Sequence, residues 1–205
     1  PMNVQFNNDG SKMFIGGRVN QKVFEYSLST NFDISSASYT GNFIDVSTQV
    51  GNDSLFGLTF SPDGTMMFVN EKGDGDDHLH QYSLNKSFDL SGGANFIRSA
   101  DLETQTAEDS QSNGIAFNQS GTRMFMIGSF RNEINQYTLS EGFNISTASF
   151  DGGAEVRKFD GTGGDPNGIT FSPSGLRMYV AGINDTEIIE YHLPCPFNLF
   201  AGKCT

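Results

Sequence analysis

The hydrophobic and polar residues of this chain follow one pattern that occurs four times. Each copy opens with a phenylalanine, a turn and then a methionine: FNNDGSKMFI (6–15), FSPDGTMMFV (60–69), FNQSGTRMFM (117–126) and FSPSGLRMYV (171–180). The leading phenylalanines at 6, 60, 117 and 171 are spaced by 54, 57 and 54 residues. Self-similarity at such a period indicates a repeat architecture.

Two further segments follow each copy in the same order. The first is VFEYSL (23–28), LHQYSL (79–84), INQYTL (134–139) and IIEYHL (188–193). The second is FDIS (32–35), FDLS (88–91), FNIS (143–146) and the deviant FNLF (197–200). Four copies in register are far more than chance produces.

Each repeat is predicted to be β structure. GLTF (57–60), SPDG and TMMFV (65–69) form a strand, a tight turn and a strand, since proline presets φ and glycine fits where bulkier residues resist. The tyrosine–leucine segments alternate apolar and polar residues, which is typical of a strand. A weaker fourth strand is expected at NFIDV (42–46), NFIRSADL (95–102) and AEVRKF (154–159).

These strands predict an all-β fold with about four blades of four antiparallel strands, the last one incomplete. No segment shows sustained helical periodicity. Four short strands in about 50 residues correspond to one β-propeller blade. We expect a single domain over residues 1–205, with blades at about 1–56, 57–113, 114–167 and 168–205.

The phrase F-S-P-D-G-x-x-M-F-V, present four times, resembles the strand–turn–strand signature of YVTN-type and WD-type β-propellers. This resemblance covers the whole chain, although the period of about 55 residues is longer than in those families. It implies a propeller fold and leaves the function open, because propellers include enzymes, lectins and scaffolds. The repeated Phe, Met, Tyr and Leu residues are expected to pack adjacent blades together.

The positions of the two chain ends relative to the repeat leave three arrangements of the blades open. The last blade has three predicted strands, up to Leu193, and residues 194–205 are too short for a normal fourth strand. A four-bladed ring could close with this short blade, or the chain could be a piece of a longer propeller. Alternatively, the open sheet edge could accept a strand from another subunit.

The charge composition of the chain narrows the classes of partner that the protein could bind. The chain has 24 acidic and 12 basic residues, a formal net charge of −12, so no basic stripe is available for nucleic acid. The same charge disfavours an anionic membrane surface, and no apolar run approaches the roughly 18 residues of a membrane span. We therefore expect neither nucleic-acid binding nor membrane insertion.

Most of the acidic excess falls in loops that a propeller gathers on one face. These residues are Asp53, Glu71, Asp74, Asp76, Asp77, Glu108, Asp109, Asp160, Asp165, Asp185 and Glu187. Asp74, Asp76 and Asp77 surround a glycine and are the candidate Ca²⁺ ligands, because Ca²⁺ takes several carboxylate and carbonyl oxygens. His78 and His80 are two apart on a strand and point to one face, as a transition-metal pair requires, or they are ordinary blade surface.

Catalytic signatures are scarce in this sequence. It contains no G-x-S-x-G, H-E-x-x-H or Walker loop, and it has three histidines, the last being His192. The architectural resemblance to propeller lactonases and esterases, which hold a central Ca²⁺, implies candidates at comparable loop positions. These are Asp53, Asn70, Asn113 and Asn167.

The two cysteines and the glycosylation sequons bear on the cellular compartment in which the protein is found. Cys195 and Cys204 lie nine positions apart near the end, without zinc-site spacing, so we predict a disulfide and an oxidising compartment. Five N-x-[ST] sequons occur where roughly three would arise by chance, so they carry little information. Asn118 and Asn144, in predicted turns, would be the exposed glycosylation acceptors on a secretory route.

The leading hypothesis is a non-enzymatic extracellular or cell-surface propeller that binds or assembles. Its partner would be a protein or glycan on a surface, or further copies in an oligomer or filament joined through sheet edges. Two alternatives are a carbohydrate-binding, lectin-like propeller and a Ca²⁺-dependent propeller hydrolase.

Overall fold

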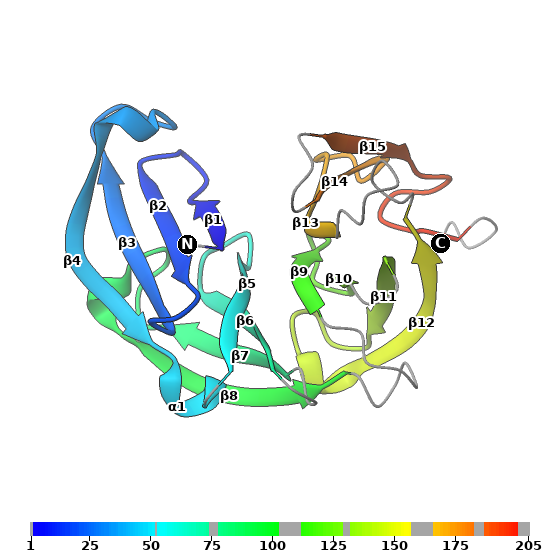
Figure 1. The fold of residues 1–205 in the computed structure, drawn as a ribbon, viewed down its shortest axis with the longest axis horizontal. Helices are drawn as coiled ribbons and strands as arrows, with labels where there is room; N and C mark the ends of the chain where they lie inside the picture. Colours follow the sequence, from blue (N-terminus) through cyan, green and yellow to red (C-terminus); the bar gives the residue numbers. More distant parts are fainter. Residues whose placement is uncertain are drawn as a thin grey trace. The chain divides into compact units, whose positions relative to one another are not determined.

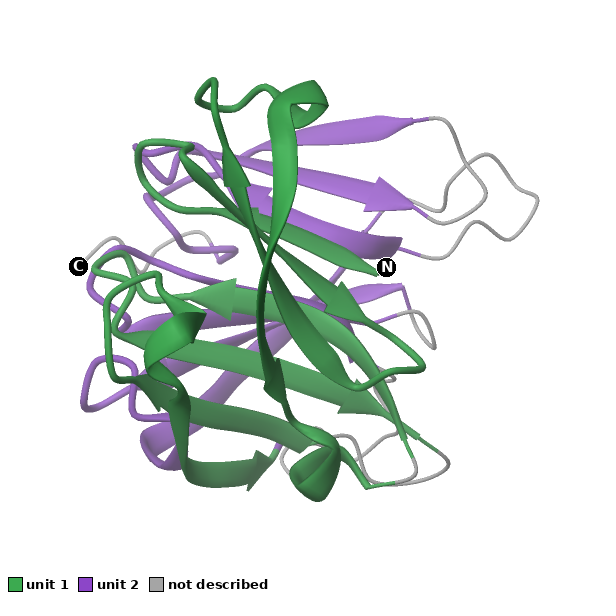
Figure 2. Cartoon of the chain, turned by 90° about the vertical axis from the view of Figure 1, so that its left-hand side faces the viewer, with its two compact units in different colours: residues 1–101 green, residues 102–205 purple. Residues whose placement is uncertain are grey.

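The computed structural model describes residues 2–51, 53–73, 78–102, 112–128, 132–156, 166–182 and 187–200. Their strands form four antiparallel sheets in a four-bladed β-propeller arrangement, and the last sheet has three strands (Figure 1). The predicted fold class is therefore confirmed. The chain divides into two compact units, residues 1–101 and 102–205, which Figure 2 colours separately. Each unit contains two consecutive blades.

Unit 1 holds the first eight strands, and each of its sheets follows the order of the sequence. Blade 1 consists of β1 (Asn3–Phe6), β2 (Lys12–Gly17), β3 (Lys22–Leu28) and β4 (Ala37–Asp45). Blade 2 consists of β5 (Ser54–Phe60), β6 (Met66–Lys72), β7 (His78–Leu84) and β8 (Ala94–Asp101).

Unit 2 holds the other seven strands in the same order. Blade 3 consists of β9 (Ser112–Phe117), β10 (Arg123–Gly128), β11 (Glu133–Leu139) and β12 (Ala148–Glu155). Blade 4 consists of β13 (Pro166–Phe171), β14 (Arg177–Gly182) and β15 (Ile188–His192).

The fourth strand of each complete blade begins earlier than its sequence predicts. The largest shift is in blade 3, where β12 starts at Ala148 and the expected strand began at 154. The reason is a short 3₁₀ turn directly before each of these strands, which delivers the chain straight into pairing. These turns are η1 (Ile34–Ser36), η2 (Leu90–Gly92) and η4 (Ile145–Thr147).

Helical structure in the described residues is otherwise limited to α1 (Ser47–Val50) in unit 1. Each 3₁₀ turn is capped by the side chain before it, as when Asp89 accepts from the Ser91 N–H at 2.9 Å. None of the helices in the described part of the chain has the length and apolar character to cross a membrane.

The tight turn between the first two strands of a blade has the same backbone in every repeat, with a glycine at positive φ whose N–H donates to the carbonyl three residues earlier. In blade 2 the Ser61 hydroxyl donates to Asp63 Oδ1 at 2.6 Å and the Thr65 N–H donates to the same oxygen at 3.0 Å. These hydrogen bonds hold the pKa of Asp63 below its ordinary value. Gly64 follows at φ +68°, a left-handed conformation that glycine adopts at little cost.

Each blade has two faces, which we name by their residues. The front face carries the repeated methionine and tyrosine, as Met67, Val69 and Tyr82 do in blade 2. The back face is the opposite one. In unit 1 the back face of blade 1, through Phe14, Val23 and Ile44, shares a hydrophobic core with the front face of blade 2.

Unit 2 repeats this back-to-front packing. Phe125, Ile134 and Val156 of blade 3 form one core with Met178 and Val180 of blade 4. The prediction that the repeated apolar residues pack neighbouring blades together therefore holds within each unit.

A hydrogen bond also joins the two blades of each unit. In unit 1 the Leu90 N–H, in the turn before β8, donates to the buried Glu25 Oε2 of blade 1 at 2.7 Å. In unit 2 the Leu199 N–H of blade 4 donates to the buried Gln136 Oε1 of blade 3 at 2.8 Å. Glu25 and Gln136 occupy the same repeat position, as do Leu90 and Leu199. We call this contact the latch.

Candidate functional site

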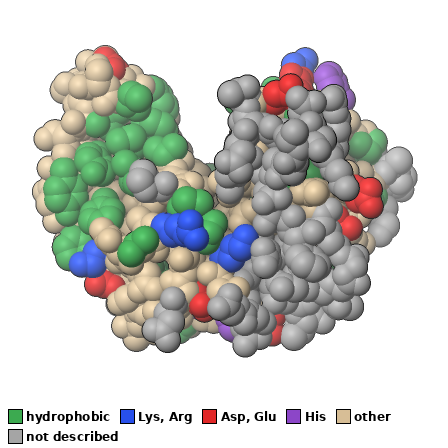
Figure 3. All heavy atoms as spheres, viewed as in Figure 1, with side chains coloured by type: hydrophobic (Ala, Val, Ile, Leu, Met, Phe, Trp, Pro, Cys, Tyr) green, Lys and Arg blue, Asp and Glu red, His purple; other side chains and the backbone are tan. Residues whose placement is uncertain are grey.

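The front face of blade 1 is an apolar surface made of two rows that cross the sheet. Cross-strand pairing aligns one row as Val4, Ile15, Phe24 and Phe43. The second row contains Phe6, Met13, Tyr26 and Tyr39, aligned in the same way. In Figure 3 hydrophobic side chains, shown in green, gather over the strands of unit 1 at the left of the view.

Aromatic side chains on β3 and β4 form the half of this face that lies away from β1. The rings of Tyr26 and Tyr39 lie 5.4 Å apart between centroids, those of Phe24 and Phe43 6.3 Å apart, and those of Phe24 and Tyr39 6.1 Å apart. These separations are in the range of favourable aromatic pairs. The Lys22 ammonium lies 4.3 Å from the centre of the Phe43 ring and 3.5 Å from Asp45 Oδ2, so a charged rim borders the patch.

Apolar residues on the equivalent face of blade 2 are buried by its neighbouring blade. There Leu58, Val69 and Tyr82 are buried against blade 1. Their counterparts in blade 1 are Val4, which is 51% exposed, and the half-buried Ile15 and Tyr26. Blade 1 therefore exposes an apolar surface of the type that blade 2 buries.

A polar cluster takes the place of the phenylalanines in blade 2. His80 and Ser99 pair across β7 and β8 at the position of Phe24 and Phe43. His80 Nδ1 lies 2.8 Å from Ser99 Oγ, and Glu71 Oε1 lies 3.0 Å from His78 Nδ1. Glu71 and His80 are buried, whereas Ser99 is exposed. The predicted common face of His78 and His80 is thus correct, and their neighbour is Glu71.

This cluster resembles the serine–histidine–carboxylate arrangement of hydrolases in its residue types. His80 Nε2 lies 3.2 Å from Glu71 Oε2, so the two side chains form an ion pair when the imidazole is protonated.

Glu71 also acts on the tyrosine of the same face. Burial, together with the negative charge of Glu71, raises the pKa of Tyr82 above its ordinary value. The phenol therefore stays protonated and donates to Gln49 Oε1, in α1 of blade 1, at 3.1 Å. This bond adds a polar contact to the apolar interface of the two blades.

The predicted acidic loops are only partly described. Eight of the eleven acidic residues, among them the Ca²⁺ candidates Asp74, Asp76 and Asp77, lie outside the described residues, so that site stays a prediction. Of the other three, Glu187 is exposed and Asp53 half-buried, but Glu71 is buried among blade side chains. Glu71 was predicted to lie in a solvated loop, but β6 continues to Lys72, further than the repeat pattern indicated.

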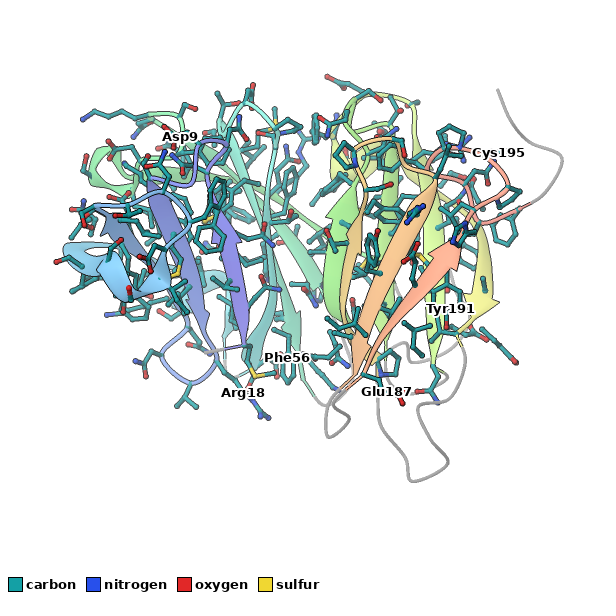
Figure 4. All side chains as sticks on the ribbon, turned by 90° about the horizontal axis from the view of Figure 1, so that it is seen from above. Asp9, Arg18, Phe56, Glu187, Tyr191 and Cys195 are labelled. Atoms are coloured by element: carbon teal, nitrogen blue, oxygen red, sulfur yellow. The ribbon has the colours of Figure 1, made fainter. Side chains whose placement is uncertain are left out.

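Basic residues also reach these loops in unit 1. The Arg18 guanidinium lies 4.9 Å from the centre of the Phe56 ring, and the Lys72 ammonium lies 5.2 Å from it (Figure 4). Phe56 is buried, so the two cations border an apolar residue. The loop end of unit 1 is therefore of mixed charge.

The lactonase-like candidates are distributed over both units. Asp53 and Asn70 belong to unit 1, and Asn113 and Asn167 belong to unit 2. The Asp53 carboxylate lies against Gly73, where a Cβ would be 2.0 Å from Oδ1, and Asn113 Nδ2 donates to the Pro166 carbonyl at 3.0 Å. Among the residues that the structure describes, no group of three His, Cys, Asp or Glu side chains is arranged to hold a metal ion.

The cysteine and glycosylation predictions remain open. Cys195 is buried beyond the end of β15 (Figure 4), but Cys204 lies outside the described residues, so the disulfide stays a prediction. Asn118 and Asn144 are half-buried, and their amide nitrogens donate to Thr122 Oγ1 at 3.2 Å and to Glu141 Oε2 at 2.7 Å.

Comparison with known proteins identifies the fold. No protein-family model matches the chain, and no curated protein sequence matches it significantly. Among solved structures, a putative 6-phosphogluconolactonase from Bacteroides uniformis matches at 13% identity with a TM-score of 0.58. This match covers 93% of this chain and 52% of the other.

Two further structures show the same relationship. A periplasmic gluconolactonase from Pseudomonas aeruginosa matches at 16% identity and TM-score 0.59, covering 92% of this chain and 48% of the other. The mitotic checkpoint complex contains a match at 12% identity and TM-score 0.58, covering 94% of this chain and 48% of the other. These distant likenesses show a β-propeller similar to lactonase, YVTN-like and WD40 propellers. The chain spans about half the length of the structures it matches.

Proposed function

We propose that this chain is a non-enzymatic structural module that assembles through the front face of blade 1. The observation that carries the proposal is the exposure of Val4, with Ile15 and Tyr26 half-buried, at positions that are buried in blade 2. A role outside the cell or on its surface belongs to the same proposal and rests on the predicted pairing of Cys195 with Cys204.

Both the size and the composition of the face support assembly. Its two rows hold eight apolar side chains, and burying one Val or Ile contributes roughly 1.5–3 kcal/mol. Contiguous apolar surface bordered by polar residues is characteristic of protein interaction sites. Tyrosine, phenylalanine and methionine, which this face combines, are enriched in the buried centre of such interfaces.

Sedimentation velocity over a range of protein concentrations tests the proposal. The wild-type chain is expected to form species heavier than its monomer mass of 22.3 kDa. A double variant, Val4→Ser with Phe43→Ser, removes the exposed apolar side chains at both ends of one row and should remain monomeric. Val19→Ser is the matched control, because Val19 is 86% exposed but lies outside both rows.

Two results would overturn the proposal. One is a wild-type chain that stays monomeric at every concentration. The other is a double variant that associates as strongly as the wild type and the Val19 control. The carbohydrate-binding and Ca²⁺-dependent hydrolase alternatives stay predictions.

A further inference from the structure

We propose that Ser99 is an activated nucleophile, a site at which the chain is acylated by esters that carry an apolar acyl group. The site lies on the front face of blade 2, and all of its residues belong to unit 1. Acylation at this site is independent of the proposed assembly through blade 1, so either can fail alone.

Ser99 has a general base within hydrogen-bonding distance. Its Oγ lies 2.8 Å from His80 Nδ1, and the two residues pair across β7 and β8. A serine hydroxyl is a weak nucleophile until a neighbouring base takes its proton. His80 is in position to take that proton, because Nδ1 is the atom closest to the hydroxyl.

A buried carboxylate sets the proton on the other nitrogen of the same imidazole. Glu71 Oε2 lies 3.2 Å from His80 Nε2, and the side chains of Glu71 and His80 are 5% and 3% exposed. The carboxylate favours the tautomer with its proton on Nε2, because the negative charge attracts the polarised N–H and burial strengthens that attraction. Nδ1 is then the acceptor and Ser99 the donor. The same charge stabilises the imidazolium that forms when Ser99 reacts.

His78 holds the second oxygen of this carboxylate. Its Nδ1 lies 3.0 Å from Glu71 Oε1, and its ring stacks on that of His80 at 6.2 Å between centroids. The order of the nitrogens is the reverse of the common serine–histidine–carboxylate triad, in which the serine faces Nε2. Either nitrogen of an imidazole can accept or donate a proton, so the relay works in this order as well.

The nucleophile is accessible, although the groups that activate it are not. Ser99 is exposed and lies on β8, an edge strand of its sheet. On the same face Phe96 is 44% exposed, and its ring centroid lies 6.4 Å from that of His80. An apolar acyl group can pack against this ring beside Ser99. The net charge of −12 disfavours an anionic ester, so the ester class that fits is neutral and apolar.

The reaction is a single acyl transfer. Ser99 Oγ attacks the carbonyl carbon of the ester, and its proton passes to His80 Nδ1. A new bond from Oγ to that carbon forms, the bond to the leaving alkoxide breaks, and the alkoxide takes the proton from His80. The products are acyl-Ser99 and the free alcohol, so no further reactant is needed. The chain is left modified, in agreement with a structural role.

Treatment of the full chain with p-nitrophenyl butyrate, a neutral apolar ester, tests the proposal. Intact mass should show one butyryl group, and peptide mapping should locate it on Ser99. Ser99→Ala should carry none, and His80→Gln should slow labelling by at least about 100-fold, the contribution of a general base. Ser38→Ala is the matched control and should label like the wild type, because Ser38 is an exposed serine on β4 that pairs with Ser27 and not with a histidine.

Glu71 is a positioning residue, and charge separates that role from simple packing. Glu71→Gln should slow labelling, and Glu71→Asp, which keeps the charge, should restore part of the rate. Butyryl groups spread over several side chains, or a His80→Gln variant that labels as fast as the wild type, would contradict the proposal. Circular dichroism shows whether each variant is folded. Wild-type protein without a butyryl group on Ser99 overturns the proposal whether or not the variants fold.

Discussion

At the scale of single residues, one glycine and one phenylalanine fix the turn of every repeat. Gly10, Gly64, Gly121 and Gly175 have φ between +68° and +72°, and Phe32, Phe88, Phe143 and Phe197 have φ between +47° and +61°. The phenylalanine ring covers the glycine, so a Cβ on Gly64 would lie 2.1 Å from the Phe88 ring. The glycine is therefore required both by its backbone conformation and by the ring above it.

This double requirement predicts an unequal cost for two glycine substitutions. Gly64→Ala should lower the free energy of unfolding by about 2–4 kcal/mol, because it adds a clash to the backbone strain. Gly41→Ala has a similar backbone strain at φ +87° but no atom within 4 Å, so it should cost about 1 kcal/mol. Denaturant unfolding of both variants checks the difference, and equal costs would exclude a role for the ring.

The residue pattern predicted the tight turn but not the phenylalanine ring that covers its glycine. The glycine spacing and the S-P-D-G sequence indicate a tight turn directly, because turn chemistry is local. The F-D-I-S segment was visible as a repeat, yet nothing in its composition shows that its phenylalanine adopts positive φ. That conformation is decided by the packing of the ring on a glycine 22 to 24 residues earlier.

At the scale of elements, the latch connects one blade to the turn of the next. Glu25 is buried and accepts from the Leu90 N–H at 2.7 Å and from Asn42 Nδ2 at 3.3 Å. Lys12 Nζ lies 3.5 Å from the same carboxylate. A buried backbone N–H that loses its acceptor carries a desolvation cost, so the latch should be visible in stability.

The latch predicts that the acceptor oxygen matters more than the charge. Glu25→Gln, which introduces the residue type of blades 2 and 3, keeps an oxygen for the Leu90 N–H and should cost less than about 1 kcal/mol. Glu25→Leu leaves that N–H unpaired and should cost about 1–3 kcal/mol more. Chemical denaturation compares the two variants. Equal stability of the two would mean that the hydrogen bond to Leu90 contributes nothing.

The repeat pattern predicts the face of the sheet on which a side chain lies but not which side chains it contacts on the neighbouring strand. The period-two alternation assigns residues to the two faces of a sheet correctly, and His78 and His80 do share a face. The alternation does not show that Glu71, on the neighbouring strand, lies 3.0 Å from His78 and 3.2 Å from His80. Strand register and the length of β6 decide that contact, and both depend on the whole sheet.

At the scale of the whole molecule, the net charge of the chain would oppose the proposed assembly. Each copy carries a formal net charge of −12, so two copies repel one another as they approach. Salt screens this repulsion, since the Debye length falls from about 30 Å at 0.01 M to about 8 Å at 0.15 M. The apolar contacts are affected far less by salt at these concentrations.

We therefore expect association to strengthen as ionic strength rises over this range. Sedimentation velocity at the two salt concentrations measures the change in the dissociation constant, and the double variant Val4→Ser with Phe43→Ser should stay monomeric at both. Association that weakens with salt would show that attraction between opposite charges, and not apolar burial, drives assembly.

The all-β class, the four blades, the short last blade and the apolar residues between blades can all be read from the amino-acid sequence. These properties follow from periodicity and turn chemistry, which act over a few residues and repeat four times. Tertiary structure alone decided which repeated positions are buried and which are exposed. Val23 and Ile188, or Leu90 and Ile34, are equivalent in sequence, yet the first of each pair is buried and the second is exposed, because burial depends on the packing around each position and not on its residue type.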